Sequence, residues 1–162
     1  MRREVPGPGQ ESVWDYPRPP AVQRVSAEVV VVLGGVEIAR STAALRVLET
    51  SHPPVYYLPP ADVVAGVLTA SARSSYCEFK GMAAYCSVVA GGRHEADAAW
   101  YYPQPSPGYE QLAGHIAFYP ARMDACFVGA EQVRPQEGDF YGGWVTASVV
   151  GPFKGGPGSR AW

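Results

Sequence analysis

The sequence predicts a mainly β fold: a single compact domain of antiparallel strands with two short helices. Among its 162 residues are 18 glycines and 16 prolines, which interrupt the chain too often for long helices. Ten tyrosines and four tryptophans add residue types that are enriched on half-buried pleated surfaces. Hydrophobic residues make up 47% and charged residues 17%, a composition that can bury a core and is not that of a disordered chain.

The N-terminal part predicts a flexible segment, an extended segment and a hairpin. Residues 1–10 alternate proline with glycine and are expected to be a flexible lead-in. Residues 11–20 combine prolines with aromatic side chains, which is typical of an extended segment. The runs Val29–Leu33 and Val36–Ala39 are rich in β-branched residues and are joined by Gly34-Gly35. This pattern predicts a β-hairpin with both glycines at positive φ.

The boundaries of the remaining predicted elements are set by glycine and proline residues, which interrupt helices and strands. Two short helices are expected, from about Pro59 to Leu68 and from Pro107 to Ala113, because proline favours a helix start. Further strands are expected over residues 45–48, 55–58, 75–79, 82–89, 97–102, 115–119 and 123–128.

Beyond Arg134 the chain becomes rich in glycine. We expect residues 135–162 to form an extension that is draped over the core or mobile, with Trp144, Phe153 and Trp162 as candidate anchors. The predicted organisation is therefore a lead-in (residues 1–10), a β domain (residues 11–134) and this C-terminal extension.

Charge and hydropathy exclude several classes of partner. The net charge is −2 and the basic residues are scattered, so a nucleic-acid partner is not expected. The longest apolar run, Val29–Leu33, is too short to cross a bilayer, and the first residues lack the apolar stretch of a signal peptide. We therefore expect a cytoplasmic protein whose three cysteines are reduced. The oligomeric state stays open.

The sequence contains no cofactor or metal motif. It has neither the glycine fingerprint of dinucleotide-binding folds nor a phosphate-binding loop. Cys77, Cys86 and Cys126 are dispersed and form no C-x-x-C pair, so neither a zinc site nor any other cofactor is expected. A Cys77/His115 nucleophile pair can be imagined, but Cys77 shares a strand face with Phe79 and fits a small buried hydrophobe better.

Lys80 and His115 are the candidate catalytic residues. Lys80 precedes Gly81 in a predicted turn, on the same strand face as Tyr76 and Glu78. A lysine among aromatic walls can have a lowered pKa and serve as an acid, a base or an anion anchor. The alternative, which its position in a turn favours, is an exposed lysine. His115 is either functional or satisfied by a backbone carbonyl after the second helix.

The aromatic side chains are the candidate ligand-binding residues. Many of them must belong to the core, but tyrosines at strand ends also build ligand cages, with a stacking surface and a hydroxyl donor. The residues selected on this basis are Tyr56, Tyr57, Trp100 and Tyr119.

Four segments in this order resemble domain of unknown function family 427. They are residues 48–59 (LETSHPPVYYLP), 76–81 (YCEFKG), 97–100 (DAAW) and 115–120 (HIAFYP), and the resemblance extends from about Glu11 to Arg134. It implies a β-tent-like fold and a site around Tyr56, Tyr57, Lys80, Trp100, His115 and Tyr119.

The resemblance also bears on chemistry. β-Tent domains often hold zinc with two C-x-x-C pairs, which this sequence lacks, so the fold is expected without the metal. The family is sometimes labelled nucleotidyltransferase-like. Enzymes of that type use Asp-x-Asp to hold Mg²⁺, and this sequence contains no Asp-x-Asp.

Three interpretations of function stay open. The first is a small-molecule-binding domain that works as a metal-independent enzyme, with Lys80 and His115 in a tyrosine-rich pocket. The second is a non-catalytic reader that binds a ligand or a peptide in the same pocket. The third is a structural or interaction domain. A pocket that contains Lys80, His115 and several tyrosines would count against the third.

Overall fold

The computed structural model describes residues 1–162, and it is built of short strands joined by turns. All strand pairs are antiparallel except one, so the prediction of a mainly β fold with antiparallel strands is confirmed. The only helical segments are four 3₁₀ turns of three residues each. None of them is long enough to cross a membrane.

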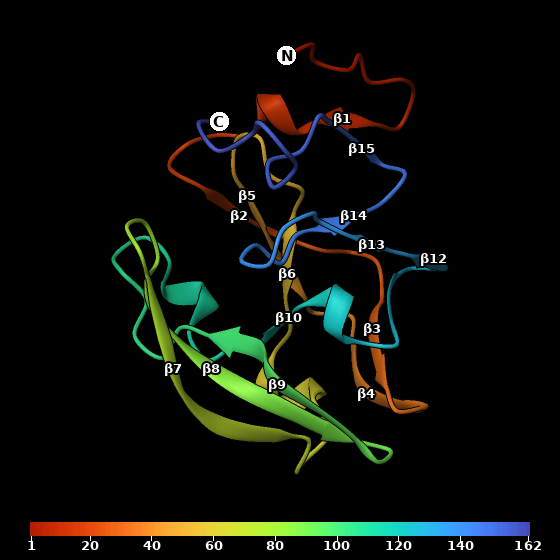
Figure 1. The fold of residues 1–162 in the computed structure, drawn as a ribbon, viewed down its shortest axis with the longest axis vertical. Coiled ribbons are helices and arrows are strands. Elements are labelled where there is room, and N and C mark those ends of the chain that lie inside the picture. The colour runs from red at the N-terminus through yellow and green to blue at the C-terminus, as the bar shows by residue number, and fades with distance from the viewer.

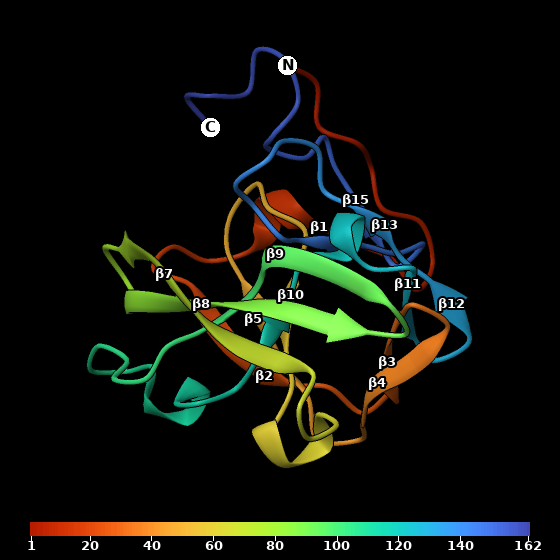
Figure 2. The ribbon, with the colours of Figure 1, turned by 60° about the horizontal axis from the view of Figure 1, so that its bottom comes forward.

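The longest strands form one curved sheet with the order β10-β9-β8-β7. Its strands are β7 (Leu68–Cys77), β8 (Gly81–Ala90), β9 (Arg93–Tyr101) and β10 (Ala117–Phe118). Figure 2 shows β7, β8 and β9 side by side across the front of the molecule. The register shifts once in each long pair, and such irregularities bend a sheet. The curved sheet in Figure 1 therefore wraps around one side of the core.

A second sheet contains the predicted hairpin. Its order is β12-β11-β3-β4, and the hairpin strands are Val29–Leu33 (β3) and Val36–Ser41 (β4). Gly34 and Gly35 have φ of 61° and 73°, which confirms the predicted glycine turn. The partner strands are β11 (Ala125–Val128) and β12 (Glu131–Gln132).

The glycine turn of this hairpin lies against the turn between β8 and β9, at the lower right of Figure 1. A Cβ atom on Gly34 would lie 2.2 Å from the carbonyl oxygen of Ala90, and one on Gly91 would lie 1.9 Å from that of Gly34. The two backbones can approach this closely only because neither glycine has a side chain. The contact fixes the second sheet against the end of the curved sheet.

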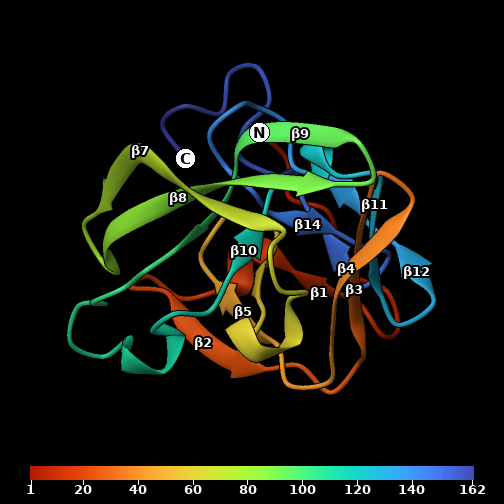
Figure 3. The same cartoon turned by 90° about the horizontal axis from the view of Figure 1, so that it is seen from below.

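A three-stranded sheet lies between the curved sheet and the N-terminal segment. Its strands are β2 (Ala21–Arg24), β5 (Leu45–Leu48) and β6 (Val55–Tyr57), in the order β2-β5-β6. Figure 3 shows β10 and β5 between the long strands and β2. Aromatic side chains fill the space between β5, β6 and the curved sheet, in a cluster that includes Tyr57, Tyr85, Trp100, Tyr102 and Tyr119.

Residues of the C-terminal extension belong to the core. Strands β13 (Arg134–Pro135) and β14 (Trp144–Val145) pair with each other, and β15 (Val149–Val150) pairs in parallel with β1 (Glu11–Ser12). Trp144 is fully buried and stacks on Tyr56 with 4.9 Å between the ring centroids. Figures 1 and 2 show both chain ends on the same side of the molecule, next to β1 and β15.

The prediction of two short helices is wrong. The first is reduced to a 3₁₀ turn at Pro60–Asp62, because Val63 is already extended and forms a β-bridge with Ala39. The second is reduced to a 3₁₀ turn at Glu110–Leu112, and Ala113 forms a bridge with Tyr102. Runs this short do not offset the cost of helix nucleation, and neighbouring strands provide hydrogen-bond partners instead. Several strand boundaries also differ: β7 begins at Leu68, β9 begins at Arg93, β11 begins at Ala125, and β10 is shorter than the predicted strand 115–119.

Candidate functional site

A cavity of about 300 Å³ lies between the β7–β8 hairpin, the strands β5 and β6, and the C-terminal extension. Its inner walls include the buried aromatic residues Tyr57, Trp100 and Tyr102. Tyr76 and Phe140 also line it, and both are exposed. The cavity therefore extends from the aromatic cluster to the protein surface.

The aromatic wall is organised around Trp100. Its ring centroid lies 4.6 Å from that of Tyr119, 6.3 Å from that of Tyr57 and 6.5 Å from that of Tyr85. The pairs are tilted or edge-on, as aromatic contacts in protein cores prefer. Burial raises the pKa of Tyr57, Tyr102 and Tyr119, so these phenols stay protonated at neutral pH. The wall thus offers flat apolar faces and hydroxyl groups, without a negative charge.

The turn between β7 and β8 positions Lys80. Gly81 follows it with φ of 106°, and a Cβ atom there would lie 3.1 Å from the hydroxyl of Ser106. The backbone N–H of Ser106 donates to the carbonyl of Lys80 at 2.9 Å, which holds the turn against the loop after β9. Lys80 as a residue is only 9% exposed, and its side chain lines the cavity, with Nζ 5.9 Å from the ring centroid of Tyr102. The expectation of an exposed turn lysine is wrong.

Lys80 carries its charge without an ion pair. Burial by itself lowers its pKa, but Tyr57, Cys77 and Glu49 raise it, and the pKa lies above its ordinary value. The lowered pKa considered for a proton-transfer lysine is therefore not found. No carboxylate lies within 4.0 Å of its ammonium group. Lys80 therefore presents a positive charge without a carboxylate partner to this end of the cavity, which makes it a place for an anion.

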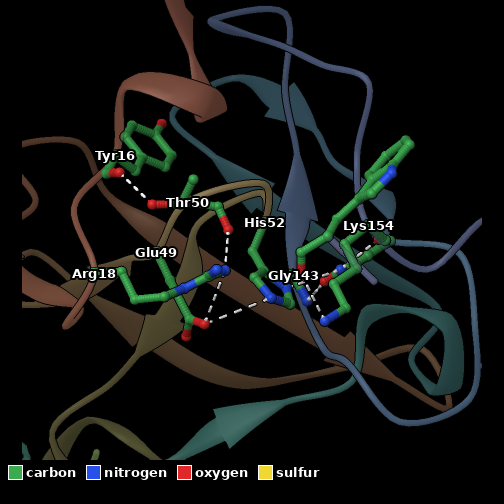
Figure 4. Close-up of polar contacts among 9 residues, drawn as sticks. Tyr16, Arg18, Glu49, Thr50, His52, Gly143 and Lys154 are labelled. Atoms are coloured by element: carbon green, nitrogen blue, oxygen red, sulfur yellow. Dashed lines mark hydrogen bonds and ion pairs between the residues drawn. The ribbon is translucent and has the colours of Figure 1, made fainter. Parts of the chain in front are cut away.

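A chain of polar contacts runs along another wall of the cavity (Figure 4). Glu49 lies 3.5 Å from Arg18 and 3.7 Å from Nε2 of His52. The side-chain amide of Gln136 lies 3.2 Å from Nδ1 of His52 and donates to the carbonyl of Lys154 at 2.7 Å. Glu49 is thus engaged by Arg18 and forms no ion pair with either lysine.

The tautomer of His52 follows from its neighbours. The side-chain carbonyl oxygen of Gln136 accepts from the backbone N–H of Gly143, so its NH₂ group faces Nδ1 of His52. Nδ1 must therefore be the acceptor, and Nε2 carries the proton. Burial, together with the charges of Lys154, Arg18 and Lys80, lowers the pKa of His52 to about 4. His52 is neutral at neutral pH.

The structure brings together Lys80, Tyr57, Trp100 and Tyr119, four of the six candidate site residues. It does not bring His115 or Tyr56 to the cavity. The Nδ1 atom of His115 lies 3.3 Å from the carbonyl of Ala113, which is the backbone contact considered as its alternative role. Tyr56 points into the core against Trp144, on the opposite face from Tyr57. Consecutive strand residues face opposite sides, so the sequence could have excluded one of this pair.

Several lining residues were missed by sequence reasoning. Tyr102 had a usable signal, because it shares a strand face with the candidate Trp100. Glu49 and His52 lie in residues 48–59, a segment that carries the family resemblance, but they reach the cavity from a loop, so no strand face pointed to them. Gln136, Tyr141 and Lys154 also lie in loops and had no signal.

The cavity does not have the residues of a metal centre. No group of three or more His, Cys, Asp or Glu side chains is close enough to hold an ion. Burial raises the pKa of Cys86 and of Cys126, which is unfavourable for the thiolate that zinc requires. The absence of zinc stays a prediction, which elemental analysis of the purified protein can check.

Gly142 brings the extension into contact with the aromatic wall. A Cβ atom on this residue would lie 2.3 Å from Cη2 of Trp100, so any side chain here would displace one of the two. The extension and the indole ring are thus in direct backbone-to-ring contact.

No curated protein matches the chain in sequence. Residues 21–129 match the family described as a domain of unknown function, DUF427. This span holds Lys80, the aromatic wall, Glu49 and His52, whereas Gln136, Tyr141, Gly142 and Lys154 lie outside it. This match covers more than half of the chain, and the chain therefore belongs to the DUF427 family.

Proposed function

We propose that this protein binds a small aromatic molecule that carries an anionic group. The anion would pair with Lys80, and the ring would lie against Tyr57, Trp100 and Tyr102. The observation that carries the proposal is the Lys80 ammonium, which is buried, has no ion pair and opens into an aromatic cavity.

The size and the composition of the cavity support this ligand class. About 300 Å³ is at the lower end of small-molecule sites, and it suits one or two fused rings. Hydrogen bonds from an ammonium to a carboxylate are charge-assisted and are about twice as strong as those between neutral groups. An aromatic carboxylate would therefore satisfy both features of the site at once.

Binding is favoured over proton-transfer catalysis by the charge state of Lys80. A lysine whose pKa lies above its ordinary value is not a proton acceptor at neutral pH, although it remains a good anion anchor. His115, the second catalytic candidate, does not line the cavity. We also propose, from the family resemblance alone, that the fold is β-tent-like. That the protein acts in the cytoplasm is a further proposal, which the resemblance does not address.

Calorimetric titration with two matched probes tests the proposal. 2-Naphthoate and 2-naphthamide have the same ring system, but only the first carries a charge. We expect 2-naphthoate to bind at least tenfold more tightly, and we expect Lys80→Met to remove that preference. Arg24→Met, which removes an exposed charge on β2, should leave it unchanged.

Two results would overturn the proposal. One is that neither probe binds, and the other is that Lys80→Met binds 2-naphthoate as the parent protein does. Circular dichroism melting of each variant shows that a loss of binding is not a loss of the fold.

A further inference from the structure

Cys77 is the one cysteine that reaches the cavity. It is half-buried and lines the wall together with Lys80, whereas Cys86 and Cys126 are buried in the core. We propose that Cys77 is the nucleophile of a covalent binding site, which takes aromatic disulfides that carry an anionic group and keeps one half of them as a mixed disulfide. This inference rests on the proposed function for the placement of the ring and the anion, and it adds a covalent step.

The turn between β7 and β8 places Cys77 and Lys80 together. Cys77 is the last residue of β7 and pairs with Gly81, the first residue of β8, so only residues 78–80 separate the two strands. The hydrogen bond from Ser106 to the carbonyl of Lys80 fixes this turn, and Cys77 packs against the aromatic cluster. The thiol and the ammonium therefore line the same cavity from one turn.

Cys77 lies close to the groups that would hold the ligand. Burial lowers the pKa of Lys80, and Tyr57 and Cys77 are among the groups that raise it. Burial raises the pKa of Tyr102, and Tyr57 and Cys77 add to this effect. Interactions between charges weaken with distance, so Cys77 is near both the lysine and the inner aromatic wall. Lys80 is an independent sign of a ligand here, because it is nine-tenths buried, lines the cavity and has no carboxylate partner.

The covalent step is a thiol–disulfide exchange. The thiolate of Cys77 attacks one sulfur atom of the disulfide, a new S–S bond forms, and the old S–S bond breaks with its electron pair on the departing sulfur. The departing half leaves as an aryl thiolate, and the thiol proton of Cys77 goes to solvent. Cys77 is thereby oxidised and the departing half is reduced. Negative charge spreads over the sulfur atoms during the attack, and the ammonium of Lys80 stabilises it.

The other two cysteines do not compete with Cys77. Cys86 and Cys126 are 6% and 1% exposed, and both belong to the core. Burial raises the pKa of both thiols, so they supply little thiolate at neutral pH. One retained aryl group suits the cavity of about 300 Å³, and the departing half leaves on the side where the cavity meets the surface.

The absorbance of the released aryl thiolate measures the reaction. The anionic probe is 5,5′-dithiobis(2-nitrobenzoate), with a carboxylate on each ring, and the matched neutral probe is the corresponding diamide. With the reduced full chain at neutral pH, we expect the anionic probe to modify one cysteine quickly and peptide mass spectrometry to identify it as Cys77. Cys77→Ser should lose this fast reaction. The two buried thiols should react only after urea unfolds the protein.

The preference for the anionic probe tests the role of Lys80. The ratio of the rate constants for the two probes is divided by the same ratio for 2-mercaptoethanol, a thiol without a binding site. This normalised preference should be at least tenfold in the parent protein and about one in Lys80→Met. Arg24→Met, which removes an exposed charge, should keep the parent value. Lys80→Gln replaces Lys80→Met should the latter melt at a much lower temperature.

The two proposals fail in distinguishable ways. If 2-naphthoate binds through Lys80 but Cys77 stays unmodified or shows no preference for the anionic probe, the covalent site is wrong and the first proposal stands. If 2-naphthoate does not bind and Cys77 shows no preference, both proposals fail. Saturating 2-naphthoate should also slow the modification of Cys77 at least tenfold, because both probes occupy one cavity. An unchanged rate would mean that Cys77 reacts outside the ligand site, and it would overturn the inference.

Discussion

Lys80 is a buried cation whose charge the folded protein favours. Its pKa lies above the ordinary value, because the effects of Tyr57, Cys77 and Glu49 outweigh that of burial, so protonated Lys80 contributes stability at neutral pH. We therefore predict that Lys80→Met lowers the free energy of unfolding at pH 7 by about 1 kcal/mol, or the melting temperature by roughly 2–4 °C. Thermal unfolding by circular dichroism checks this. An unchanged or higher melting temperature would mean that the buried ammonium is a cost to the unliganded protein.

His52 makes stability depend on pH. Its pKa is about 4 in the folded protein, against an ordinary value of 6.5, so the unfolded chain binds more protons between these values. The stability that comes from a neutral His52 is complete above pH 6.5 and is lost as the pH falls toward 4. The loss amounts to a few kcal/mol.

Urea unfolding at several pH values between about 4.5 and 7 measures this dependence. His52→Gln cannot be protonated, and we expect its stability to change less with pH than that of the parent protein over this range. Parallel pH profiles for the two proteins would contradict the assignment of a neutral, buried His52.

At the scale of elements, the contact between the β3–β4 turn and the β8–β9 turn can be tested with two matched substitutions. Gly35 has positive φ, but a Cβ atom there would have no other atom within 4 Å, whereas a Cβ atom on Gly34 would meet the backbone of Ala90. Gly35→Ala should cost about 1 kcal/mol, from its conformation alone. Gly34→Ala should cost about 3 kcal/mol or more, since the two backbones must separate. If urea unfolding gives the same loss of stability for both substitutions, the contact between the two turns does not stabilise the fold.

The same elements show what could be predicted from the sequence. The β3–β4 hairpin was predictable because its turn chemistry is local: two glycines stand between two β-branched runs. The short helices were mispredicted because Val63 and Ala113 are extended by bridges to distant residues. His115 and Lys80 were both selected beside a glycine, but Lys80 lies in a turn held against Ser106 and lines the cavity, whereas His115 contacts the carbonyl of Ala113.

At the scale of the whole molecule, the candidate site is assembled from segments far apart in the chain. Lys80 and the aromatic wall lie within the family region. The shared strand face of Trp100 and Tyr102 could be deduced from alternation. Lys80 lies in the turn after β7, where alternation does not apply, and both Cys77 and Phe79, which alternation placed on the opposite face, also line the cavity. The other half of the cavity could not be predicted, because Gln136, Tyr141 and Lys154 lie in segments without periodicity. The glycine-rich composition left open whether the extension is draped over the core or mobile. The lack of a side chain on Gly142 is what allows the extension to contact Trp100.

The parallel pairing of β1 with β15 has a consequence for the order of folding. It joins Glu11 to Val149, and closing so long a loop loses entropy that no contact offsets until the two strands meet. We expect the β-hairpins to form first and this pair to form last, carrying Lys154 into place. Pulse-labelling hydrogen exchange should then protect the amide of Glu11, which donates to Ser148, later than the amides of β8. A newly made chain would therefore complete its family region before it completes its binding site.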